Sequence, residues 1–138
     1  MTEILVAIAI VSILAAVVLV SAQSYGKKAR SSRAASQLTS VIPSMSACFM
    51  NGGEINDPAA GDDICTEERT YGQWPSFTGS LVNYSYTGTF DFSGPRDWYL
   101  KARSSSSYDN VTICCNSTMN SCANIGNATA ACIATTTW

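Results

Sequence analysis

An apolar segment from Ile4 to Val20, directly preceded by the acidic residue Glu3, constrains this chain more than any other feature. The segment consists of Ile, Leu, Val and Ala with one Ser, and it contains no Pro or Gly. As a helix it would span roughly 26 Å, close to the roughly 30 Å of a bilayer core. Because backbone groups in lipid must be satisfied within the segment, we predict that it is helical.

Glu3 places a carboxylate at the start of this helix. An ionised carboxylate is costly in hydrocarbon, so one found there is expected to have a partner and a function. The first basic residue of the chain is Lys27, which is too far along the helix to pair with it. We therefore expect the partner to be the amino terminus of a neighbouring copy, which indicates a protein that assembles.

Two simpler interpretations of the apolar segment compete with this one. Val20-Ser21-Ala22 resembles a signal peptidase site, but a signal peptide begins with basic residues and has a shorter apolar stretch. A plain single-pass anchor explains the segment but explains neither Glu3 nor the apolar stripe that follows.

That stripe extends the helical periodicity to about Met50. Apolar residues three or four apart form one face, namely Ala35, Leu38, Ile42, Met45 and Phe49. We predict one long helix, apolar all round in its first half and amphipathic in its second. Pro43 should kink this helix or remove a hydrogen bond near Thr39, and Asn51-Gly52-Gly53 should end it.

The rest of the chain indicates a loop and then strands. Gly and Pro residues punctuate 51–80, where Trp74 and Phe77 are expected to hold the loop on the head. Apolar and polar residues alternate in 82–92, 97–103 and 110–115, with Gly88 as a bulge or bend, a turn at 93–95 and a flexible link at 104–107. These patterns predict an α+β fold, in which the amphipathic half of the helix packs on a small antiparallel sheet of about 81–115.

Six cysteines follow the apolar segment, and their even number indicates disulfides in an oxidising compartment. Cys48 at the helix end and Cys65 in the next loop are the most plausible pair. Cys114 and Cys115 face opposite ways in a strand, so each should bond Cys122 or Cys132, and the connectivity stays open. These bonds would close the small, polar tail of 116–138.

The composition argues against catalysis and nucleic-acid binding. The chain has no His, so it cannot form a Ser-His-Asp or Cys-His site, and no enzyme activity, cofactor or metal is predicted. Its basic residues cluster just after the apolar segment, at Lys27, Lys28, Arg30 and Arg33, rather than along the head. They are either a solvated face near a membrane or a contact with an acidic head of a neighbouring subunit. Four sequons, at Asn83, Asn110, Asn116 and Asn127, are candidate sites for N-linked sugar.

The residues from Glu3 to Ala16, EILVAIAIVSILAA, resemble the amino-terminal segment of type IV pilins and type II secretion pseudopilins. The resemblance is close over about the first thirty residues. It is loose for the rest of the chain, where only the order of long helix, loop, antiparallel sheet and disulfide-closed tail agrees. It is strongest to a major type IV pilin. It implies a precursor held in the inner membrane, cleavage by a prepilin peptidase, methylation of the new amino terminus, and a pilus assembly machinery that stacks the helices into a filament.

The resemblance also assigns roles to residues. Glu3 would pair with the terminal amine of an adjacent subunit, and the filament core would include Ile4, Leu5, Ile8, Ile10, Ile13, Leu14 and Val17. Family members have two more residues between the cleavage site and the glutamate than this chain. We therefore expect the mature protein to contain residues that precede Met1. Many relatives have a proline where this chain has Val20, so we predict a continuous helix there.

We therefore predict a filament-core helix of 1–26 and a head of 27–138, which includes the second half of the helix. The expected function is that of a subunit of an extracellular type IV pilus, which serves adhesion, twitching motility or DNA uptake. The alternatives are a type II secretion pseudopilin and a minor tip pilin that acts as a binding module. Six cysteines favour the surface-exposed filament, and the surface ligand is not readable from the sequence.

Overall fold

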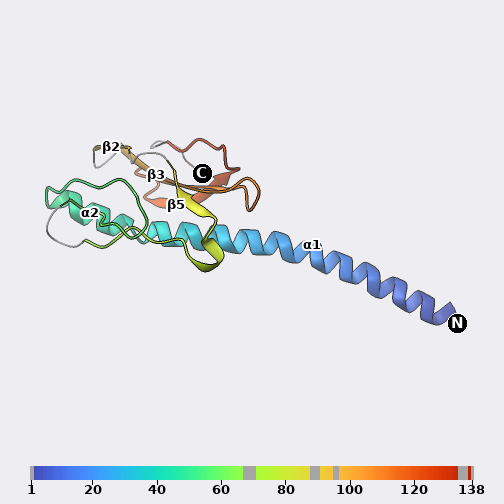
Figure 1. The fold of residues 1–138 in the computed structure, drawn as a ribbon. Helices are drawn as coiled ribbons and strands as arrows, with labels where there is room; N and C mark the ends of the chain where they lie inside the picture. Colours follow the sequence, from blue (N-terminus) through green and yellow to red (C-terminus); the bar gives the residue numbers. More distant parts are fainter. Residues whose placement is uncertain (1, 67–70, 88–90, 95–96, 134–136, 138) are drawn as a thin grey trace.

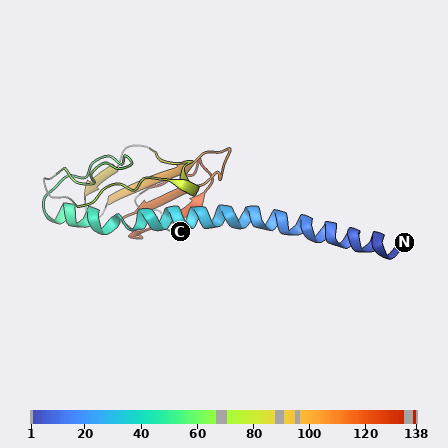
Figure 2. The ribbon, with the colours of Figure 1, turned by 60° about the horizontal axis from the view of Figure 1, so that its bottom comes forward.

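The computed structural model describes residues 2–66, 71–87, 91–94, 97–133 and 137 of the 138-residue chain. Two helices in line are followed by a long loop and an antiparallel sheet (Figure 1). The first half of the helical rod projects away from the head, and the sheet lies along its second half (Figures 1 and 2). The predicted α+β class, with a long amino-terminal helix, an antiparallel sheet and disulfides, is confirmed.

The predicted single helix is in fact two, α1 (Thr2–Thr39) and α2 (Ile42–Met50). Pro43 has no N–H to offer to the carbonyl of Thr39, so the helix is interrupted just before it. At the interruption the Val41 N–H donates to the Leu38 carbonyl at 3.1 Å, a shorter-range bond than the helical one. The backbone of α1 is continuous through Val20, as predicted.

The predicted stop after Met50 is confirmed. Asn51 caps α2, and Gly52 follows with a φ of +81°, a left-handed conformation that suits glycine. The Gly53 N–H then donates to the Cys48 carbonyl at 3.1 Å and satisfies one of the last free carbonyls of the helix.

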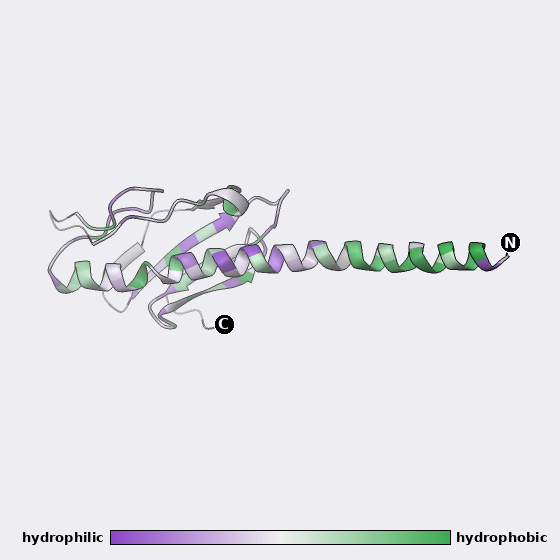
Figure 3. Cartoon of the chain, turned by 90° about the horizontal axis from the view of Figure 1, so that it is seen from below, coloured by the Kyte–Doolittle hydropathy of each residue, from purple (hydrophilic) through white to green (hydrophobic). Residues whose placement is uncertain are grey.

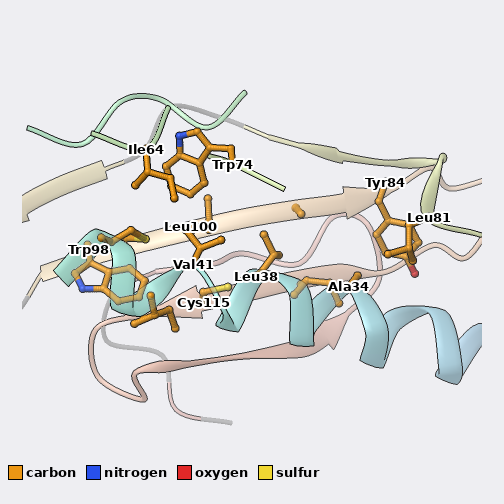
Figure 4. Close-up of a cluster of buried hydrophobic side chains, with 14 of the residues drawn as sticks. Ala34, Leu38, Val41, Ile64, Trp74, Leu81, Tyr84, Trp98, Leu100 and Cys115 are labelled. Atoms are coloured by element: carbon orange, nitrogen blue, oxygen red, sulfur yellow. The ribbon is translucent and has the colours of Figure 1, made fainter. Parts of the chain in front are cut away.

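One stripe of the second half of the rod is buried against the head. Its most buried members are Ser31, Ala34, Leu38, Val41, Ile42, Met45 and Cys48. Leu38, Ile42 and Met45 were expected, whereas Ala35 and Phe49 are only partly buried at the edge of the stripe. Figure 4 shows Leu38 of α1 and Val41, between the two helices, converging with Leu100 of the sheet.

The sheet contains β1 (Tyr84–Tyr86), β2 (Asp91–Gly94), β3 (Asp97–Ser104), β4 (Thr112–Asn116) and β5 (Ser121–Gly126). It is an antiparallel meander in which β1 and β2 both pair with β3. The strand predicted over 82–92 is therefore two short strands. Gly88, the expected bulge, lies outside the described residues, as does part of the turn expected at 93–95.

Strand β5 was missed by the sequence analysis, which treated 116–138 as a loop. It pairs with β4 so that Cys122 lies opposite Cys115, and the two are bonded. The flexible link predicted at 104–107 also needs correction. Ser104 ends β3, is 1% exposed, and accepts a hydrogen bond from the Asp109 N–H at 3.1 Å.

The loop between α2 and β1 covers the far end of the core. Cys48 and Cys65 are bonded as predicted and tie the loop to α2. Trp74 is 1% exposed, and Phe77 packs on the Tyr86 ring at a centroid distance of 5.0 Å, so both hold the loop on the head as expected. Figure 4 shows Trp74 beside Ile64 above the sheet.

All five residues of β4 are buried because both faces of the strand are covered. Ile113 and Cys115 belong to the face that meets the helices. On the other face Cys114 is bonded to Cys132 of the tail. Neighbouring strand residues point to opposite faces, so Cys114 and Cys115 bond different partners, and the connectivity left open by the sequence is resolved.

Candidate functional site

The first half of α1 is an apolar rod whose described side chains are exposed. The large side chains from Ile4 to Leu19 are 53–69% exposed. The colours of Figure 3 change from hydrophobic to mixed about halfway along the rod, near the point where the head begins. All predicted filament-core residues lie on this exposed surface: Ile4, Leu5, Ile8, Ile10, Ile13, Leu14 and Val17.

The one hydroxyl in this segment does not interrupt its apolar character. Ser12 Oγ donates to the Ile8 carbonyl at 2.7 Å, so its hydrogen-bonding capacity is met within the helix. Among the described residues this is the one helix long and apolar enough to cross a membrane by length and composition. Exposed apolar surface on this scale marks a region that lipid or another protein covers.

Glu3 lies in the first turn of α1 and is exposed. Carboxylates are favourable there because the helix dipole is positive at this end. Within the described part of the chain no basic group forms an ion pair with it. Lys27, the nearest basic residue in sequence, lies roughly 36 Å further along the helix. A partner for this carboxylate must therefore come from outside the described residues.

The four basic residues predicted to contact a neighbouring subunit have different environments. Lys27, Lys28 and Arg33 are exposed, and Arg33 Nη1 donates a long hydrogen bond of 3.5 Å to Ser80 Oγ. Arg30 is instead engaged within its own chain. An inter-subunit charge contact therefore stays a prediction for the three exposed residues.

Arg30 forms a clamp between α1 and the loop that joins β3 to β4. Its Nε donates to Asp109 Oδ2 at 2.9 Å, and its Nη2 donates to Oδ1 at 2.5 Å. The guanidinium also lies over the Tyr108 ring, 4.9 Å from its centroid. Tyr84 completes the clamp, because its hydroxyl donates to Asp109 Oδ2 at 2.9 Å. The clamp sits where the exposed half of α1 leaves the head.

The clamp keeps Asp109 ionised although its side chain is 1% exposed. Hydrogen bonds from Arg30 lower the pKa of Asp109, burial partly opposes this, and the Tyr84 hydroxyl lowers it further. The pKa of Tyr84 is raised, chiefly by burial and then by its bond to Asp109, so this hydroxyl stays protonated and keeps donating. Two donors and a buried acceptor thus hold the helix at a fixed place on the head.

The tail is held on the outer face of the sheet by side chains of β3 and β4. Thr112 Oγ1 donates to the Asn127 carbonyl at 2.8 Å, and Asn116 Nδ2 donates to the Ile133 carbonyl at 3.1 Å. Arg103 Nη2 donates to the Ala130 carbonyl at 3.3 Å. Asn116 is one of the four sequons, and its complete burial leaves no room for a sugar on the folded chain.

Sequence reasoning missed Asp109, Tyr84 and Tyr108 as members of the clamp. One signal was available, because Asp109 is the only acidic residue after Asp97 and would be expected to have a role. Nothing in the sequence connects it with Arg30, which lies 79 positions earlier. That contact depends on the sheet placing the β3–β4 turn beside α1.

Comparison of the chain with protein-family models, curated proteins and solved structures finds no match.

Proposed function

We propose that this chain is a subunit of an extracellular filament of the type IV pilus kind, assembled through its amino-terminal helix. The observation that carries the proposal is the apolar rod, which exposes all its large side chains between Ile4 and Leu19. It begins with Glu3, for which the described part of the chain supplies no ion-pair partner. In a precursor the rod would lie in the inner membrane. In the filament, rods of neighbouring copies would cover one another.

The anchorage of the rod supports assembly rather than simple tethering. A membrane tether works with a flexible link, whereas a helical filament requires every subunit to present its head at the same angle to its rod. Here the helix runs without interruption from Thr2 into the head, and Arg30 and Asp109 hold it there. Three disulfides stiffen the head itself and suit an oxidising compartment.

In this proposal Glu3 selects the docking position of each new subunit. A carboxylate among packed apolar rods is stable only beside a positive charge, and the terminal amine of the adjacent copy would supply one. Removing one partner of such a pair leaves an uncompensated charge, which costs about 3–5 kcal/mol in a dry core. The loss would weaken assembly rather than folding of the single chain, because Glu3 is exposed in the single chain.

The test is filament yield in the native host, measured by electron microscopy and immunoblotting of material sheared from cells. We expect Glu3→Ala to leave folded, membrane-held subunits and to lower the filament yield at least tenfold. The matched control is Glu54→Ala, which removes an exposed acid from the head and should leave the yield unchanged. A wild-type yield from Glu3→Ala would refute the pairing role. Absence of filaments from wild-type cells would refute the proposed function.

A further inference from the structure

An open groove lies at the junction where α1 leaves the head. One wall is the helix over 22–27 together with Arg30, and the other is the β3–β4 loop at 107–109. The cavity volume is about 550 Å³, which is enough for a small polar group with its hydration. Neither the clamp nor the apolar rod requires this space to be open.

The chemistry of the groove suits an anion. Lys27 lines it and is an exposed residue. Arg30 uses Nε and Nη2 for Asp109, whereas its Nη1 faces Gly26, where an added Cβ would lie 3.3 Å from that nitrogen. Glycine at this position therefore leaves the Nη1 donors accessible. Ser24 and Ser107 also line the groove.

The position of the groove along the helix matches the depth of lipid headgroups. The apolar segment ends at Val20, and the groove begins two residues later at Ala22. With a rise of about 1.5 Å per residue, 22–27 covers roughly 3–10 Å beyond the hydrocarbon, and the headgroup layer is roughly 5–8 Å thick on each side. Tyr25, with 77% of its surface exposed, lies at the same depth, where aromatic side chains gather in membrane proteins.

In the orientation of the proposed function, the basic residues also lie on the less usual side of the membrane. Lys and Arg next to a membrane helix ordinarily mark the cytoplasmic side. The three disulfides of the head instead suit an oxidising compartment. Orientation therefore does not account for the basic residues at this end of the helix, and Lys27 in particular has room for another role.

We propose that this groove binds the phosphate headgroup of an anionic phospholipid while the precursor lies in the membrane, with Lys27 and Arg30 Nη1 as its ligands. The inference rests on the membrane stage of the proposed function. It goes beyond that function because it assigns a lipid site that holds the head against the bilayer before assembly. Bound there, a headgroup would meet the two cations and Ser24 on the helical wall and Ser107 on the loop wall.

The experiment uses the full chain in lipid nanodiscs of phosphatidylcholine and phosphatidylglycerol in a 3:1 ratio. Native mass spectrometry after detergent release counts the phosphatidylglycerol molecules retained by each variant. One basic side chain near an anionic surface contributes about 1 kcal/mol, or about fivefold in affinity. We expect Lys27→Gln to retain about fivefold less phosphatidylglycerol than Lys28→Gln, because Lys28 has the same charge but does not line the groove. A second variant, Gly26→Leu, should lower retention without any change of charge.

Three results would overturn the proposal. The first is an equal loss from Lys27→Gln and Lys28→Gln, which would show diffuse attraction to the surface. The second is equal retention of phosphatidylcholine and phosphatidylglycerol by the wild type. The third is displacement of the lipid by millimolar inorganic phosphate, which would identify free phosphate as the ligand. Filaments are not needed for this measurement, so its failure is separate from that of the filament proposal.

Discussion

Arg30 of α1 and Asp109 of the β3–β4 loop are 79 positions apart and form a bidentate ion pair, with nitrogen–oxygen distances of 2.9 and 2.5 Å. The pair lies near the point where the exposed half of the helix begins. The direction in which the apolar rod leaves the head is therefore set by a charge-assisted contact rather than by apolar packing alone. A filament built from such subunits would depend on this contact for the uniform angle of its heads.

Asp109→Asn should destabilise the head by about 2 kcal/mol, because it removes the counter-charge of the partly buried Arg30 guanidinium. Urea unfolding of the detergent-solubilised chain, followed by near-ultraviolet circular dichroism, measures this. The control is Asp97→Asn at the exposed start of β3, which should change stability by less than about 0.5 kcal/mol. Equal effects of the two substitutions would contradict a stabilising role for the clamp.

The clamp also predicts a specific loss of stability in acid. The pKa of Asp109 in the folded chain is lowered, mainly by its bonds to Arg30, from about 3.9 in an unfolded chain. Its contribution is therefore complete above about pH 4 and is lost as the pH falls through the folded pKa. Between pH 5 and pH 2 the melting temperature of the wild type should fall more steeply than that of Asp109→Asn. Parallel curves would show that Asp109 is not linked to folding.

Two disulfides of nearly equal span should differ in what they protect. Cys48–Cys65 and Cys114–Cys132 close loops with sequence separations of 17 and 18 residues. By chain entropy each contributes about 3 kcal/mol to the free energy of unfolding. Replacing both cysteines of either pair by Ala should destabilise the head similarly. Only the Cys114/Cys132 variant should lose amide-exchange protection in 127–132, because that bond holds the tail on the sheet. Equal protection in the two variants would mean that Thr112 and Asn116 suffice to hold it.

An inter-subunit role for the exposed basic residues can be tested separately from the clamp. Charge reversal in the double variant Lys28→Glu/Arg33→Glu should weaken filaments more at 10 mM than at 150 mM salt. The reason is that the screening length falls from about 30 Å to about 8 Å over this range. Stability of sheared filaments, scored by electron microscopy after dilution, gives the measurement. A loss of filament stability that does not depend on salt would indicate a packing defect instead of a charge contact.

The parts of the fold that could be predicted depend on near neighbours in sequence. The rod, its interruption before Pro43 and its end at Gly52 follow from helix periodicity, a missing N–H and a left-handed glycine. The Cys48–Cys65 bond was predictable because a helix end and the loop after it are necessarily close. Strand β5 was not, because Ser121–Gly126 has little apolar alternation and is ordered by its pairing with β4.

By itself, then, the sequence determined an apolar helix of membrane-spanning length headed by Glu3, an amphipathic continuation and a cysteine-rich sheet domain. Only the tertiary structure decided that Arg30 binds Asp109, that Cys114 bonds Cys132 while Cys115 bonds Cys122, and that a groove opens beside Gly26. The physical reason is one of range. Periodicity and turn chemistry act over a few residues, whereas these contacts join distant segments and exist only after the register of the sheet has placed both partners beside α1.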